Sequence, residues 1–140
     1  MTAPYSRSYV PPAAVIEIRL AAPGTAQTAG PFAALIDTGA DASLVPKSIL
    51  LAFGAPSLFE AQLRSPWGEP HAVVVYLADV LIGSERFPGI EIAADETDAE
   101  FILGRNILNK LPLFLDGPQQ VTQLLIEPAL QRLRTARSAM

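Results

Sequence analysis

Short apolar segments separated by proline, glycine and aspartate run along the whole chain, and this pattern predicts a mainly β domain with little helix. Over residues 15–20 apolar and charged side chains alternate, as in a strand with one buried face. Residues 32–36 and 101–103 are continuous apolar runs that end at Asp37 and Gly104, which is typical of buried strands ending in tight loops. We expect these two runs to be pseudo-equivalent strands on two sides of one core.

Two hairpins are predicted further along the chain. Residues 58–63 and 71–81 flank a tip rich in turn formers and indicate a long β-hairpin. Residues 113–115 and 121–126 indicate a closing hairpin across an Asp-Gly-Pro turn. Proline at the start and glycine just past the end predict a helix of about two turns over 46–53. The other expected elements are strands at 43–45 and 84–94, a short helix at 105–110, and a frayed helix or solvated tail at 129–140.

The length of 140 residues fits one domain with a substantial core. We expect an N-terminal arm at 1–13, the domain itself at 14–128 and a C-terminal tail at 129–140. The chain has no cysteine and one histidine, which excludes disulfides and argues against a zinc site. With 10 basic and 14 acidic side chains its net charge is −4, so nucleic acid is not an expected partner.

No targeting or membrane segment is expected from the pattern. The first 15 residues interleave prolines and an arginine with few large apolar side chains, so they lack the apolar core of a signal peptide. Asp79 interrupts the most apolar stretch, residues 73–82, before it reaches the length of a membrane span. We therefore expect a cytoplasmic protein without a membrane partner.

The sharpest chemical signal is the motif Ala-Leu-Ile-Asp-Thr-Gly-Ala-Asp at 34–41. The apolar residues place a strand in the core and bring Asp37 to its end, and Gly39 lets another backbone approach closely. A plain turn, with Asp37 and Thr38 bonding their own backbone, is the alternative interpretation.

A second motif, Ile-Leu-Gly-Arg-Asn-Ile-Leu at 102–108, follows the long hairpin. Together the two motifs resemble those of the retropepsin family, the retroviral-type aspartic proteases. In that family an apolar-apolar-Asp-Thr/Ser-Gly-Ala loop carries the catalytic aspartate, and an apolar-apolar-Gly-Arg-Asn/Asp segment opens a helix. The order of loop, hairpin, helix and terminal strand matches over about residues 14–115. The resemblance implies a retropepsin-like acid protease half-barrel, a closed β domain with one or two short helices and one lobe per chain.

The resemblance also implies roles for individual residues. Asp37 would be catalytic, Thr38 would brace the loop across a two-fold axis, and Gly39 would offer its carbonyl to a bound peptide. Asp41 and Arg105 resemble an acid and an arginine that pair beside the site and help to position substrate. Their alternative interpretation is a surface ion pair of little energetic value.

The tip of the long hairpin, residues 65–69, would be the flap that closes over substrate. Trp67 and Gly68 are candidate substrate contacts there, although a Trp67 packed on its own hairpin is an equal alternative. The proline and tryptophan at 66 and 67 depart from the glycine-rich tips of viral relatives. We expect His71, beside the tip, to be a solvated strand residue.

Ala40 follows the triplet at a position where two-lobed relatives usually have serine. A hydroxyl there would favour the charged form of the carboxylate. Its absence predicts activity from mildly acidic towards neutral pH. Ala40 is also a candidate substrate contact.

One aspartate is not enough for this chemistry. One carboxylate must take a proton from water while a second, protonated one donates to the scissile carbonyl oxygen, and two close carboxyls share one proton. The sequence contains a single Asp-Thr-Gly. The expected active unit is therefore a homodimer in which Asp37 of each protomer meets at the two-fold axis.

The sequence thus predicts a homodimeric aspartic endopeptidase that hydrolyses polypeptides without a metal or organic cofactor. The alternative is a retropepsin-like dimerisation or peptide-binding module that no longer cuts. The retained Asp37 favours the enzyme, because a scaffold needs the turn but not the carboxylate. A hydrolase using Ser43 with His71 is disfavoured, since the sequence lacks a nucleophile-elbow pattern.

Overall fold

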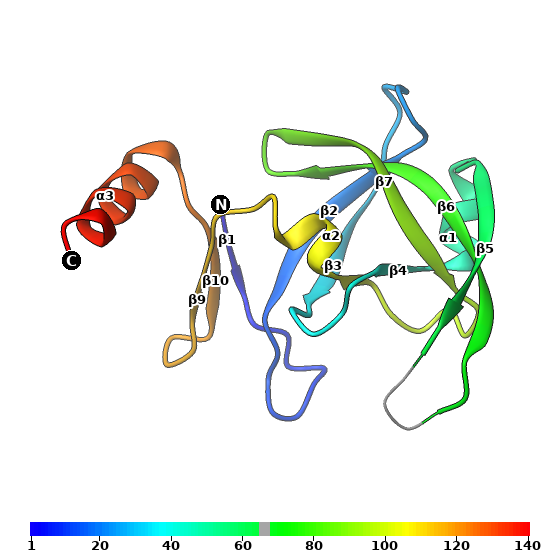
Figure 1. Ribbon diagram of the computed structural model, residues 1–140, viewed down its shortest axis with the longest axis horizontal. Helices are drawn as coiled ribbons and strands as arrows, with labels where there is room; N and C mark the ends of the chain where they lie inside the picture. The colour runs from blue at the N-terminus through cyan, green and yellow to red at the C-terminus, as the bar shows by residue number, and fades with distance from the viewer. Residues whose placement is uncertain (65–67) are drawn as a thin grey trace.

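The computed structural model describes residues 1–64 and 68–140, and in that part of the chain it has two sheets and three helices (Figure 1). The larger sheet has the order β2-β3-β8-β4-β7-β6-β5, and β2 also pairs with β6, so the sheet closes on itself. Its strands are β2 (Val15–Ala21), β3 (Ala29–Ile36), β4 (Ser43–Pro46), β5 (Ser57–Leu63), β6 (His71–Ile82), β7 (Glu85–Asp95) and β8 (Ile102–Leu103).

A smaller sheet lies beside the closed one and has the order β1-β10-β9 (Figure 1). It joins the two ends of the chain, because β1 near the N-terminus pairs with β10 near the C-terminus. Its strands are β1 (Thr2–Pro4), β9 (Leu113–Asp116) and β10 (Val121–Leu124), and the helices are α1 (Lys47–Ala52), α2 (Arg105–Leu108) and α3 (Glu127–Ser138).

The core of the closed sheet follows directly from the alternation in the sequence. In β2 the side chains of Ile16, Ile18 and Leu20 are fully buried, while Glu17 and Arg19 point outward. Each fully buried large aliphatic side chain contributes about 2 kcal/mol relative to an exposed one. Burial on one face therefore fixes the register of this strand, since a shift by one residue would bury both charges.

Both predicted hairpins are confirmed. β5 and β6 pair antiparallel up to the Leu63–His71 pair, and β9 pairs antiparallel with β10. The helix expected over 105–110 is shorter than predicted and ends at Leu108. The N–H groups of Lys110 and Leu111 bond three residues back, to Ile107 and Leu108, so the chain continues as tight turns towards Pro112.

One expectation about the architecture is wrong. The apolar runs at 32–36 and 101–103 do not lie on two sides of the core: β3 and β8 are parallel neighbours, with Leu35 opposite Ile102. The C-terminal segment, expected as a frayed helix or a solvated tail, is a helix, α3, among the described residues. Leu130 and Leu133 stand at helical spacing within it, and it carries no fully buried residue. No helix of the described ranges has the length and apolar character needed to cross a membrane.

A buried carboxylate ties the turn after β2 to the β6–β7 hairpin. Asp79 is 2% exposed and accepts hydrogen bonds from the N–H groups of Gly24 (3.0 Å) and Gly89 (2.9 Å) and from Nε of Arg86 (2.9 Å). Arg86 also donates from Nη2 to the carbonyl of Thr25 (2.7 Å). Burial alone would raise the pKa of Asp79, but the two backbone donors and the guanidinium outweigh it and hold the pKa below its ordinary value.

An Asp79→Asn substitution is expected to destabilise the fold by about 2 kcal/mol at neutral pH, because it leaves the Arg86 charge unpaired. A lowered pKa means that the carboxylate stabilises the fold above its ordinary pKa of 3.8 and loses this effect as the pH falls through the folded-state value. In urea unfolding, the difference from wild type should therefore shrink as the pH is lowered below about 4. A difference that does not change as the pH is lowered would contradict the assignment. Glu85→Gln, on an exposed strand end, is the matched control.

Candidate active site

The loop that carries Asp37 follows β3, and backbone hydrogen bonds join both of its ends to the β8–α2 segment. The N–H of Asp37 donates to the carbonyl of Leu103 (3.1 Å), and the N–H of Arg105 donates to the carbonyl of Ala40 (2.8 Å). The parallel pairing of β3 with β8 brings these two segments together. The two motifs found in the sequence therefore form one structural unit.

The Asp37 side chain lies half-buried within this turn. Its Oδ1 accepts a hydrogen bond from the N–H of Gly39 (2.9 Å), and the N–H of Ala40 donates to the Asp37 carbonyl (3.2 Å). The other carboxylate oxygen, Oδ2, accepts no hydrogen bond from any residue that the structure describes. One oxygen is thus held by the loop while the other stays available for chemistry.

Gly104 lets the two segments approach each other. A Cβ at this position would lie 2.6 Å from the carbonyl carbon of Ala42 and 2.9 Å from the Ala40 oxygen, and it would overlap the Ala42 oxygen. Real Cβ atoms do not come this close to backbone. The glycine of the Gly-Arg-Asn motif is therefore required by packing, without any need for a special backbone angle.

A buried polar network joins the loop exit to α2. The Ser43 hydroxyl, 1% exposed, donates to Oδ1 of Asn106 (2.7 Å) and accepts from the N–H of Gly104 (3.0 Å). Nδ2 of Asn106 donates to the carbonyl of Glu91 (2.9 Å). Both bonds of the Ser43 hydroxyl are therefore made within the fold. His71 lies exposed at the start of β6. These two observations exclude a hydrolase that uses Ser43 with His71. Sequence reasoning missed this use of Ser43, because no motif marks a serine that bonds across the fold.

The expected pairing of Asp41 with Arg105 is not found among the described residues. Nη1 of Arg105 donates instead to the carbonyl of Thr38 (2.9 Å), and Asp41 is exposed. The guanidinium thus braces the Asp37 turn through its backbone. Arg105 lies next to the loop as the resemblance implied, but its partner is a neutral carbonyl and the Asp41 carboxylate keeps no ion pair in this part of the molecule.

The predicted flap residues are only partly placed. Trp67 lies outside the described residues, and Gly68 is exposed in the bend before β6. Their contact with substrate therefore remains a prediction, as does the bridging of a two-fold axis by Thr38.

A groove of about 300 Å³ lies between the loop exit and the hairpin strands. Asp41 and Ala42 line it from the loop, Leu63 from β5, Val73 and Val75 from β6, and Ala93 from β7. Its size falls at the lower end of ligand-binding pockets. We call it the hairpin groove, and its position makes it a candidate for holding part of a polypeptide.

Comparison with known proteins finds the fold but no relative by sequence. No protein-family model matches the chain, and no curated protein matches it. Among solved structures, a retropepsin-like aspartic protease from Rickettsia conorii superposes with a TM-score of 0.58 over 89% of this chain and 88% of that one, at 16% sequence identity. The chain has the retropepsin-like fold.

Two further solved structures are similar. The EIAV protease complexed with the inhibitor HBY-793 gives a TM-score of 0.48 at 17% identity, covering 70% of this chain and 86% of that one. The retroviral protease-like domain of Ddi1 from Leishmania major gives 0.47 at 13% identity, covering 79% and 87%. The predicted fold class, a mainly β retropepsin-like domain, is confirmed.

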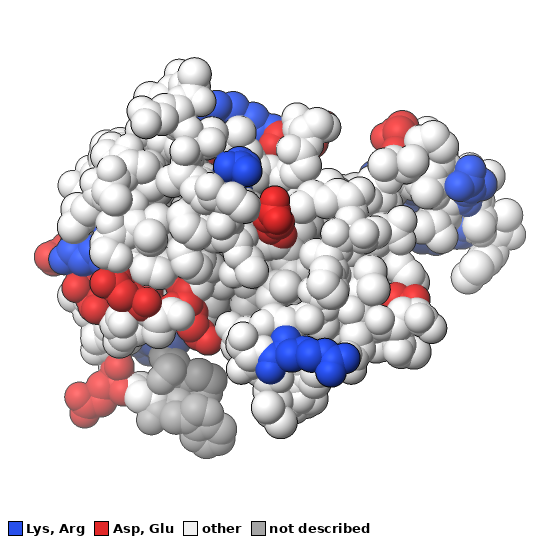
Figure 2. Space-filling model, turned by 180° about the vertical axis from the view of Figure 1, so that it is seen from behind, with Lys and Arg blue, Asp and Glu red and all other residues white. Residues whose placement is uncertain are grey.

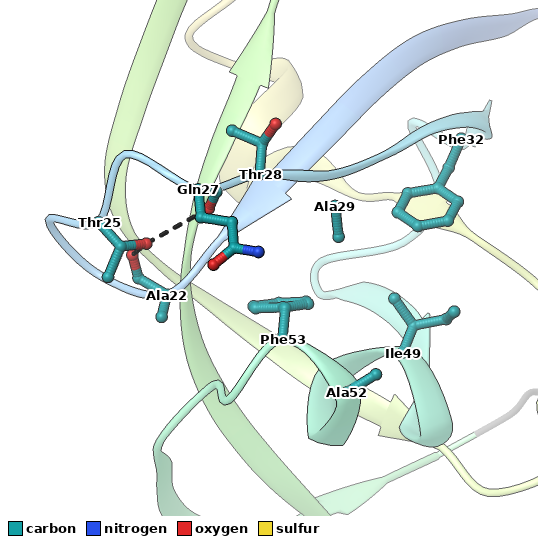
Figure 3. Close-up of a pocket in the computed structure, with 9 residues that line it drawn as sticks. All are labelled: Ala22, Thr25, Gln27, Thr28, Ala29, Phe32, Ile49, Ala52 and Phe53. Carbon is teal, nitrogen blue, oxygen red and sulfur yellow. Dashed lines mark hydrogen bonds between the residues drawn. The ribbon is translucent and has the colours of Figure 1, made fainter.

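A second cavity of this retropepsin-like domain, of about 310 Å³, lies between the turn after β2 and α1 (Figure 3). Ile49 faces it from α1, Phe53 from just past the end of α1, and Phe32 from β3 (Figure 3). Its described lining holds hydroxyl, amide and apolar groups but no acid or base, so it offers no acid–base chemistry. Within residues 1–64 and 68–140, no three metal-ligating side chains come together as a metal ion would require.

Proposed function

We propose that this chain is a homodimeric aspartic endopeptidase that hydrolyses peptide bonds between two Asp37 carboxylates, one from each protomer. The observation that carries the proposal is the Asp37 turn. It is braced on one side by the backbone of β8 and on the other by Arg105, while Oδ2 accepts no bond within the described ranges. Such bracing holds a carboxylate in one orientation, as acid–base catalysis requires.

The chemistry needs the two carboxyls in different protonation states. The ionised one takes a proton from a water molecule, whose oxygen attacks the peptide carbonyl carbon, and the protonated one donates its proton to the carbonyl oxygen. The resulting tetrahedral intermediate collapses as the carbon–nitrogen bond breaks. The carboxyl that took the proton from water passes it to the leaving nitrogen, and the other carboxylate recovers a proton from a hydroxyl of the intermediate, so the pair is again singly protonated. Two carboxyls at close range share one proton in this way because both cannot ionise together.

The edge of the small sheet supports self-association. Among the described residues β9 pairs only with β10, and its Phe114 and Leu115 are 47% and 44% exposed. An unpaired strand edge with large apolar side chains is a template for pairing with another chain. We propose that β9 of the two protomers meet at the dimer axis.

A Phe114→Lys substitution is expected to convert the dimer to a folded monomer without activity, because it places a charge on the proposed interface. Sedimentation velocity over a concentration series measures the association, and peptide hydrolysis measures activity on the same samples. Leu51→Lys on α1, which is also an exposed leucine, is the control and should stay dimeric. A Phe114→Lys protein that remains dimeric and active would disprove the placement of the interface.

Cleavage of unfolded polypeptides, with and without a statine-type inhibitor, tests the proposed reaction. Inhibitor-sensitive cleavage between mildly acidic and neutral pH is the expected result. A dimer that binds peptides but cuts none of them would instead support the non-proteolytic module.

A further inference from the structure

We infer that the hairpin groove selects substrates with a lysine or arginine side chain. This inference rests on the proposed function, since it names the polypeptide class that the same site would take. Among the described residues that line the groove, the charged ones are Asp41 and Glu91, and both are carboxylates. Figure 2 shows acidic side chains gathered on the side of the molecule that carries the hairpin tip.

The rest of the groove is mainly apolar. Val73 and Val75 of β6 and Ala93 of β7 supply aliphatic surface, and Phe59 and Leu63 of β5 extend it. Lysine and arginine have a long apolar stem with a charge at the end, so they can lay the stem on such surface and keep the charge at its polar rim. A short or acidic side chain would leave the surface empty or meet like charge.

The backbone that carries each of the two carboxylates is anchored. The Glu91 carbonyl accepts a hydrogen bond from Nδ2 of Asn106 (2.9 Å), and Ile90 and Ile92 on either side are buried, so the Glu91 side chain is on the opposite face of β7. Asp41 follows Ala40, whose carbonyl accepts from Arg105. The backbone on which each carboxylate stands is therefore anchored.

Neither carboxylate is neutralised within the described ranges. The ion pairs found there are Lys47–Glu96 and Arg86–Asp79, and the nearby Arg105 donates to a backbone carbonyl. Asp41 and Glu91 are both exposed, so a cation entering the groove meets two free negative charges. Each exposed pair contributes modestly, which sets the scale of the expected preference.

Two-fold symmetry also predicts where in the substrate the basic side chains should occur. A homodimer has two copies of the hairpin groove, one on each side of the catalytic pair. Basic side chains should therefore be enriched at two positions placed symmetrically about the cleaved bond.

A cleavage-site profile from a peptide library tests the inference. Wild-type protein should prefer lysine or arginine at such a position, and matched peptides should show kcat/KM about fivefold higher for lysine than for norleucine, its uncharged analogue. Glu91→Gln should reduce this ratio, and Glu91→Lys should shift the preference towards acidic side chains. Glu60→Gln, which removes an acid of the same hairpin that does not line the groove, should leave the ratio unchanged.

The same peptides, bound to the Asp37→Asn variant, provide a measurement that does not need catalysis. Asp37-dependent cleavage without basic preference would overturn this inference and leave the proposed function standing. Absence of cleavage, together with tighter binding of lysine than of norleucine peptides that Glu91→Gln removes, would support the groove and reject the protease. If the protein neither cleaves the peptides nor binds the lysine peptides more tightly, both this inference and the proposed function are wrong.

Discussion

Replacing Asp37 by asparagine is expected to lower the rate of peptide hydrolysis by about 10⁴-fold, because the amide can neither take a proton from water nor share one with its symmetry mate. The variant should fold and dimerise as the wild type does. The bond from the Gly39 N–H needs only an oxygen acceptor, which asparagine retains. Hydrolysis of a fluorogenic peptide measures the rate, and sedimentation and urea unfolding check the assembly.

Glu17→Gln is the control for the Asp37→Asn experiment. Glu17 is an exposed carboxylate on the outer face of β2, away from the Asp37 turn. Its variant should keep full activity. Cleavage that survives the loss of the Asp37 carboxylate would show that another group activates water.

Replacing Gly104 by alanine is expected to destabilise the protein by about 3 kcal/mol. The added methyl group must push the backbone at residue 104 away from the backbone of the Asp37 loop, which it contacts directly. The nearest atoms belong to the backbone of Ala40 and Ala42, which cannot rotate away as a side chain would. Activity should fall with stability, since the displaced backbone is that of the Asp37 loop. Urea unfolding measures the change in free energy.

Gly117→Ala is the matched comparison. An added Cβ at Gly117, in the β9–β10 turn, meets no atom within 4 Å, so this variant should be close to wild type in stability. Equal stability of the two variants would mean that the β8–α2 segment does not lie against the loop as described.

Most of the strands could be predicted from the sequence because burial leaves a direct trace in it. The alternation in β2 and the apolar runs in β3 and β8 give the elements their type and approximate limits. The pairing of β3 with β8 left no such trace, since two buried strands have the same composition whether they are neighbours or lie on opposite sides of a core. Long-range register was therefore the part of the fold that the pattern could not supply.

For the candidate site, too, only some of the residues could be found from the sequence. Asp37 and Arg105 stand in short motifs whose residue types are unusual, so they were found from the sequence. Ser43 and Asp79 were not found as structural centres, because their partners come from segments distant in sequence. The missed partner of Arg105 has the same cause: a guanidinium near a tight turn can bond either a carboxylate or a carbonyl, and only the folded backbone decides between them.

A subunit-mixing experiment tests the shared catalytic pair most directly. Wild-type protein is equilibrated with a ninefold excess of the Asp37→Asn variant, and hydrolysis is measured per wild-type subunit. If each active unit needs Asp37 from both protomers, random exchange leaves about one tenth of the wild-type subunits in active dimers, and activity should fall to about that fraction. Activity that stays at the level of the wild-type protein alone would show that one subunit is sufficient, which would contradict the account.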